Sequence, residues 1–142
     1  AHIEDISQWN WDIGEELSKI GKPLRSIADP TRYGHPAHMR NFKRVPPGEP
    51  LREGNDWGYV HSNSGIHNKA AHNLFVSGVF TWREVLSMFY LTLTKPGLLT
   101  ATSDFADSKA GMLSVCESLF GTYSDLTQRM ETIANAFAGV GI

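Results

Sequence analysis

Hydrophobic side chains recur at spacings of three and four residues in the second half of the chain, the periodicity of helices with one buried face. Four segments follow this pattern, at about 64–77, 81–95, 104–120 and 124–140. The expected buried stripes are, in chain order, Ile66, Ala70 and Leu74; Trp82, Val85, Phe89 and Leu93; Ala106, Ala110, Leu113 and Phe120; and Leu126, Met130, Ile133, Phe137 and Val140.

Start and stop signals bound these segments. Thr81 and Ser124 stand where N-cap residues are expected, and Gly78 and Gly121 stand where helices usually end. Pro96 and Gly97 together end the second segment. The connections are short, which favours antiparallel neighbours in a compact bundle of about four helices.

The first sixty residues show no long helical periodicity, because turn-forming residues interrupt them throughout. They contain Pro23, Pro30, Pro36, Pro46, Pro47 and Pro50, together with Gly14, Gly21, Gly34, Asn41, Gly48, Gly54 and Asn55. We therefore predict a mainly α protein whose loop-rich N-terminal third, 1–60, precedes a helical bundle over 61–142. At 142 residues the chain suits one domain.

Composition narrows the function classes. A hydrophobic content of 41%, a charged content of 20% and a formal net charge of -2 are those of an ordinary globular domain. That charge provides no basic field for nucleic acid, and no apolar run is long enough to span a membrane. The lone Cys116 cannot form an internal disulfide, so a buried thiol is expected.

Candidate chemistry lies just before the first predicted helix. His61 follows Asp56 by five residues, with Gly58 in the intervening turn. Such a carboxylate can accept a hydrogen bond from one imidazole nitrogen and leave the other directed outward, toward an oxyanion or a proton acceptor. On spacing alone such a pair is more often a surface hydrogen bond than a catalytic element, and both interpretations stay open at this point.

Four blocks of sequence carry a family resemblance. Residues 60–70 read V-H-S-N-S-G-I-H-N-K-A, and residues 24–39 read L-R-S-I-A-D-P-T-R-Y-G-H-P-A-H-M. Residues 11–15 read W-D-I-G-E, and residues 136–141 read A-F-A-G-V-G. In this order they resemble the G-G-V-H-x-N-S-G-I-x-N-x-A, L-R-S-x-x-D-P-x-x-Y-G-x-P-x-H, D-W-x-I-G-E and closing A-F-x-x-V-G blocks of the thermolysin-like zinc metallopeptidases.

The resemblance, which covers nearly the whole chain, implies roles for particular residues. His61 matches the residue that stabilises the tetrahedral intermediate, and Asp56 matches the carboxylate that orients it. Arg25 matches the residue that binds a substrate backbone carbonyl through two N–H donors. The apolar walls of the pocket for the side chain after the cut match Ile13, Leu17 and Leu24. From the residues alone, these three would be assigned to the core.

The same family binds catalytic zinc through H-E-x-x-H on one helix and a Glu on a later helix. No histidine of this chain precedes a glutamate, and no two histidines have the H-E-x-x-H spacing. The resemblance thus implies zinc in the complete enzyme, with its ligands expected upstream of Trp11 and outside this sequence. Residues 1–142 by themselves are expected to be inactive.

Several positions depart from the family pattern. Asn10 replaces the Asp that the family has before the tryptophan matched by Trp11, whereas Glu15 keeps a position that the family uses for calcium. A neutral amide supplies less charge to a hard cation, so the prediction of calcium there is weaker. Tyr59 replaces the second Gly ahead of His61. The remaining histidines are expected to be exposed, in a turn for His35 and His38 and on the first helix for His67 and His72.

The leading interpretation is the C-terminal lobe of a secreted zinc endopeptidase. Its expected partners are a peptide or protein substrate and the zinc-binding N-terminal lobe, and its exposed cleft face would permit self-association. The first alternative is a non-catalytic peptide-binding or pseudo-protease module that keeps only the Arg25 contact. The second is a separately folded piece, such as an autolysis product.

Overall fold

The computed structural model describes residues 4–17 and 19–142, so His2 lies outside it. Its helices are α1 (Asp56–Phe75), α2 (Trp82–Thr94), α3 (Phe105–Phe120) and α4 (Leu126–Ala138). Ahead of them, β1 (Asp12–Ile13) and β2 (Arg25–Ser26) pair antiparallel, with Asp12 opposite Ser26. Short 3-10 turns make up much of the remaining N-terminal part. The predicted mainly α fold with a loop-rich first third is therefore confirmed.

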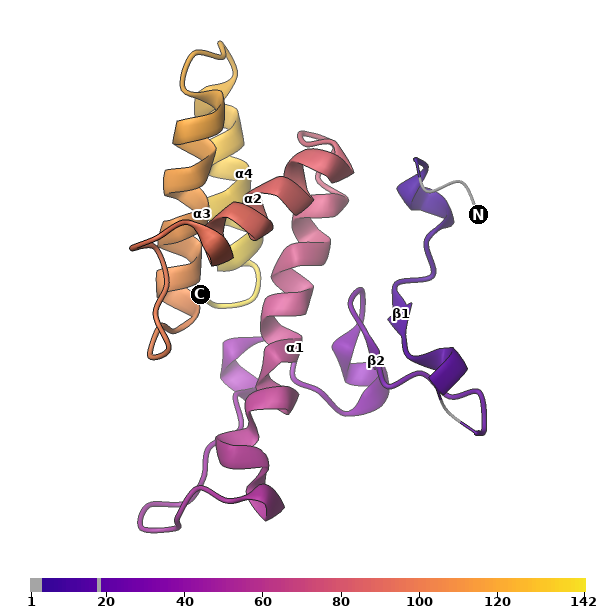
Figure 1. Ribbon diagram of the computed structural model, residues 1–142. Helices are drawn as coiled ribbons and strands as arrows, with labels where there is room; N and C mark the ends of the chain where they lie inside the picture. Colours follow the sequence, from indigo (N-terminus) through magenta and orange to yellow (C-terminus); the bar gives the residue numbers. More distant parts are fainter. Residues whose placement is uncertain (1–3, 18) are drawn as a thin grey trace.

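Helix α1 is the central element, and the other helices gather along it (Figure 1). Helices α3 and α4 lie side by side, α2 packs on α3, and α1 contacts both α2 and α4. The N-terminal segment with β1 and β2 runs along the opposite side of α1. None of the helices in the described residues is long and apolar enough to cross a bilayer.

The core forms where the four helices meet. Its side chains with no solvent exposure come from every helix: Ile66, Ala70, Leu74, Val85, Met88, Met112, Cys116, Ile133 and Phe137. The predicted stripe of α1 is thus confirmed in full, and Cys116 is the buried thiol expected from its apolar neighbours. Burial raises the pKa of that thiol.

Two predicted stripes were partly wrong. Ala106 and Ala110 of α3 are exposed, and the buried face instead carries small residues such as Ser108 and Gly111. A Cβ on Gly111 would lie 2.8 Å from the Cγ2 atom of Thr92, so the small residue permits a close α2–α3 approach. Leu93, which was expected in the core, is 73% exposed.

Two of the three later helices, α2 and α3, begin with a side chain that caps the first turn. Thr81 accepts from the Glu84 N–H while Glu84 accepts from the Thr81 N–H, and Asp104 forms the same reciprocal box with Asp107. The prediction of Ser124 as the α4 cap was wrong, because the N-cap position falls on Asp125. The Asp125 carboxylate makes no capping bond, since it accepts from Arg129 Nε at 3.0 Å.

Candidate functional site

The start of α1 is built from a left-handed turn. Asp56, Trp57, Gly58 and Tyr59 have φ angles of 53°, 50°, 96° and 61°, and regular helix follows from Val60. The Asp56 Oδ2 atom accepts from the backbone N–H groups of His61 and Ser62, at 3.0 and 3.1 Å. This cap lets the helix begin ahead of the predicted residue 64. Tyr59 occupies a left-handed position that costs L-residues about 1–2 kcal/mol.

The same carboxylate orients the imidazole of His61. Asp56 Oδ1 and His61 Nδ1 are 2.5 Å apart, and His61 keeps 76% of its side chain exposed. The His61 side-chain hydrogen bond is the largest cause that lowers the pKa of Asp56, and the Ser62 backbone N–H adds to it. An ionised carboxylate only accepts, so Nδ1 carries a proton. Nε2, which has no partner in the described part of the chain, therefore donates when the imidazole is protonated.

Arg25 is connected to the first regular turn of α1, which carries His61, through a serine hydroxyl. Its Nη1 atom donates to Ser64 Oγ at 2.9 Å, and Ser64 Oγ donates to the His61 carbonyl at 2.7 Å. The structure thus brings Arg25, His61 and Asp56 to one end of α1, although Arg25 lies on β2. Ser64 was not predicted as a functional residue, because its partner is 39 positions away in the sequence.

A glycine lets the Arg25 loop approach α1 this closely. A Cβ on Gly65 would lie 2.7 Å from the Pro36 carbonyl oxygen and 2.9 Å from His35 Cβ, so no other residue fits without movement. One turn later, Lys69 Nζ donates to the Ala28 carbonyl at 2.8 Å. These contacts hold the loop that follows β2 against the helix that carries His61.

The three apolar residues assigned to a substrate pocket lie on the surface and not in the core. Ile13, Leu17 and Leu24 are 44%, 80% and 58% exposed. The Ile13 carbonyl accepts from the Leu24 N–H at 2.9 Å, and Ile13 pairs with Arg25 in the strand register. Core packing, the interpretation that the residues alone favour, is therefore wrong for all three.

The expectation of exposed histidines was also wrong. His67 Nε2 lies 2.8 Å from Ser108 Oγ, and its ring stacks on Phe105 with 5.9 Å between centroids. His72 packs edge-on against Trp11 at 4.8 Å. Burial is the leading cause that lowers the pKa of His35, His67 and His72. Helical spacing gave no sign of this, because the covering rings come from other elements. His38 is likewise only half-exposed.

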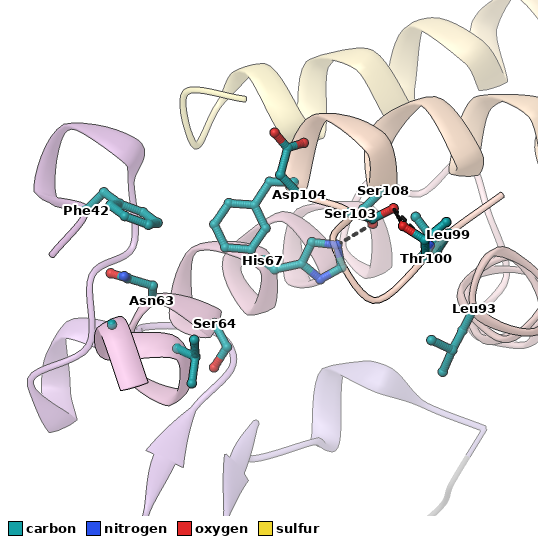
Figure 2. Close-up of a pocket in the computed structure, with 13 residues that line it drawn as sticks. Phe42, Asn63, Ser64, His67, Leu93, Leu99, Thr100, Ser103, Asp104 and Ser108 are labelled. Atoms are coloured by element: carbon teal, nitrogen blue, oxygen red, sulfur yellow. Dashed lines mark hydrogen bonds between the residues drawn. The ribbon is translucent and has the colours of Figure 1, made fainter. Parts of the chain in front are cut away.

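A cavity of about 520 Å³ opens on the His67 face of α1 (Figure 2). Its walls come from α1, the end of α2, and the segment that leads into α3. They include Val60, Asn63, Ser64, His67, Leu93, Leu99, Phe105 and Ser108. Neither His61 nor Arg25 lines it. This cavity is therefore separate from Arg25, Asp56 and His61, and it meets their hydrogen-bonded group only at Ser64.

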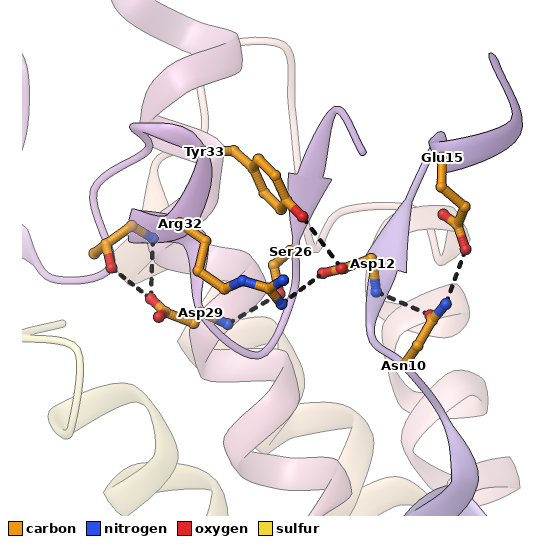
Figure 3. Close-up of polar contacts among 8 residues, drawn as sticks. Asn10, Asp12, Glu15, Ser26, Asp29, Arg32 and Tyr33 are labelled. Atoms are coloured by element: carbon orange, nitrogen blue, oxygen red, sulfur yellow. Dashed lines mark hydrogen bonds and ion pairs between the residues drawn. The ribbon is translucent and has the colours of Figure 1, made fainter. Parts of the chain in front are cut away.

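At the expected calcium position, the nearby carboxylates accept hydrogen bonds from other side chains. Glu15 Oε1 accepts from Asn10 Nδ2 at 2.9 Å, and neighbouring Asp12 is bound by Arg32 and Tyr33 at 3.3 and 3.2 Å (Figure 3). Residues 4–17 and 19–142 contain no group of three His, Cys, Asp or Glu side chains that could hold a metal ion. The described residues thus do not fit a zinc site.

Comparison with known proteins gives matches over most of the chain. The family described as thermolysin metallopeptidase, alpha-helical domain, matches residues 1–142. Bacillolysin of Bacillus amyloliquefaciens is 35% identical over 134 residues, covering 94% of this chain and 23% of the relative. A zinc metalloproteinase of Listeria monocytogenes is 35% identical over 141 residues, covering 96% and 25%. Thermolysin of Alicyclobacillus acidocaldarius is 34% identical over 144 residues, covering 94% and 24%. The chain spans about a quarter of the length of these relatives.

Proposed function

The chain belongs to the thermolysin metallopeptidase family, as its α-helical domain, and on that premise we propose that it completes the active site of a zinc-dependent endopeptidase. In this proposal Arg25 binds a substrate backbone carbonyl, and His61, oriented by Asp56, stabilises the oxyanion of the tetrahedral intermediate. The observation that carries it is the pair of hydrogen bonds that connects the Arg25 side chain, through the Ser64 hydroxyl, to the His61 carbonyl.

The contacts of His61 suit an oxyanion donor. Its Nδ1 side is held by Asp56, so the exposed ring has one orientation, and protonated Nε2 is the remaining donor. A donor fixed before the reaction stabilises developing charge without a reorganisation cost.

The apolar residues beside Arg25 suit the recognition of a bulky hydrophobic side chain. Ile13 and Leu24 expose apolar surface beside Arg25 in the β1–β2 pair, Leu17 exposes more just after β1, and a substrate side chain would bury this surface. In the same proposal, part of this surface also faces the zinc-binding lobe of the enzyme. Isolated copies of residues 1–142 would self-associate through it.

Zinc, when bound in the complete enzyme, supplies an activated water, and its ligands lie outside the described residues. Residues 1–142 alone should therefore retain no zinc after dialysis and hydrolyse no peptide. One equivalent of retained zinc, together with hydrolysis that a chelator abolishes, would show that this chain holds the metal itself. A calcium ion at Glu15 would need more oxygen ligands than Glu15 and Asn10 supply.

The experiment that tests the proposal is hydrolysis of an internally quenched peptide by the complete protein, with and without a chelator. Chelator-sensitive cleavage that zinc restores supports an endopeptidase. Peptide binding without cleavage, with zinc present, supports the non-catalytic peptide-binding module instead. We further propose that the enzyme is secreted, which its recovery from culture supernatant would test.

A further inference from the structure

We propose that Ser64 is a positioning residue that fixes the Arg25 guanidinium for substrate. The proposal rests on the proposed function, because it takes Arg25 as the residue that binds the substrate. It assigns a task to the side chain whose hydroxyl is bonded both to Arg25 and to the His61 carbonyl.

The hydroxyl geometry makes Ser64 an acceptor toward Arg25. A serine hydroxyl has one hydrogen to donate and two lone pairs. Ser64 commits its hydrogen to the His61 carbonyl at 2.7 Å, the local bond that serine often forms within a helix. The lone pairs are then available to the Arg25 Nη1 atom, 2.9 Å away, and the hydroxyl cannot rotate freely.

The charge balance distinguishes Arg25 from a structural arginine. Arg129, with 8% exposure, is bound by Glu84 at 3.1 Å and Asp125 at 3.0 Å. Among residues 4–17 and 19–142, by contrast, no ion pair joins Arg25 to a carboxylate, and its one hydrogen bond is to a neutral oxygen. Within these residues, the position of the Arg25 guanidinium therefore depends on the Ser64 hydroxyl and not on an acidic side chain.

The test compares Ser64→Ala with wild type in the complete enzyme by steady-state peptide hydrolysis. Ser64→Ala should raise KM by about tenfold, as expected for the loss of one hydrogen bond to a charged group, with kcat nearly unchanged. Ser64→Thr keeps the hydroxyl and should restore KM. Ser77→Ala is the matched control, because Ser77 Oγ donates to the Leu74 carbonyl at 2.8 Å in the same way, without an arginine partner.

A double-mutant cycle shows whether Ser64 affects kcat/KM through Arg25. If Ser64 acts through Arg25, Ser64→Ala in an Arg25→Lys background should cause little further loss of kcat/KM. Additive losses would overturn the proposal. A fall in kcat at constant KM would also overturn it, because Ser64 would then act through the turn of His61.

A second measurement does not depend on activity. Nitrogen NMR of the arginine side chains should show a slowly exchanging, ordered Arg25 guanidinium in wild type and in Ser64→Thr, and an averaged one in Ser64→Ala. An Arg25 signal unchanged by Ser64→Ala would refute the positioning role even if the enzyme hydrolyses peptides. Absence of hydrolysis by the wild type, with zinc bound, would refute the proposed function and leave the NMR result to decide the role of Ser64.

Discussion

Arg25→Lys is the substitution that best separates a substrate-binding arginine from one that supports the fold. Lysine keeps the positive charge but replaces a planar fork of donors with a single ammonium group. If Arg25 were an ordinary surface cation, the enzyme with lysine at this position would have the same activity and stability as wild type. If Arg25 holds a substrate carbonyl with two parallel donors, lysine cannot reproduce the geometry.

The structure sets the expected magnitudes. The Arg25 side chain makes one hydrogen bond within the described residues, to Ser64 Oγ, so its loss should lower the free energy of unfolding by about 1 kcal/mol at most. The lost substrate contact is a hydrogen bond from a charged donor, about 1.5–3 kcal/mol. That corresponds to a fall in kcat/KM of roughly 10- to 100-fold.

The assay needs two numbers from the complete enzyme, kcat/KM on an internally quenched peptide and the midpoint of thermal unfolding. The variant should lose most of its catalytic efficiency, chiefly through KM, while its melting temperature stays within a few degrees of wild type. Leu24→Ala is a useful comparison, because it removes a neighbouring pocket wall and leaves the guanidinium in place.

A loss of stability comparable to the loss of activity would refute this reasoning. Arg25 would then support the fold, for example by pairing with a carboxylate elsewhere in the enzyme. A silent substitution would equally remove Arg25 from substrate binding, because exposed ion pairs contribute only about 0–1 kcal/mol and tolerate either cation.

Three further predictions concern other parts of the account. His61→Ala should lower kcat about 10²–10³-fold with little change in KM, and an unchanged kcat in peptide hydrolysis would exclude His61 from the mechanism. Gly65→Ala should lower the unfolding free energy by about 1–3 kcal/mol in denaturant titrations, because the added Cβ meets the Pro36 carbonyl at 2.7 Å; Gly54→Ala, with open space, is the control. His67 has a pKa lowered by burial, so its contribution to stability is present above about pH 6.5 and is lost as pH falls through the lower folded-state value. His67→Gln should therefore flatten the pH dependence of unfolding, and an identical slope would contradict the burial of a neutral ring.

The helices were predictable wherever large apolar residues define one face. The stripes of α1 and α4 consist of residues such as Leu74 and Phe137, whose burial is large enough to decide the orientation. The buried face of α3 was not predictable from the sequence. An alanine side chain has little preference for a buried over an exposed position, and the close approach at Gly111 depends on Thr92 of another helix. Leu93 shows the opposite case, an apolar residue left on the surface.

The candidate site was predictable only where its contacts are local. Asp56 and His61 are five residues apart, and their spacing alone suggested the oriented imidazole that the geometry has. Nothing in the spacing placed Arg25 beside them, and its position was inferred from the resemblance. The role of Ser64 was not predicted, because its hydroxyl bonds to Arg25 on β2 and sequence periodicity gives no information on such a distant partner.

The most direct test of the central claim is a crystal structure of the complete protein bound to a phosphinic peptide, whose phosphinate mimics the tetrahedral intermediate. We expect His61 Nε2 to lie about 3 Å from a phosphinate oxygen and the Arg25 guanidinium to donate to a backbone carbonyl of the same peptide. Binding of the peptide elsewhere, such as in the cavity beside His67, with His61 and Arg25 out of contact, would contradict the account.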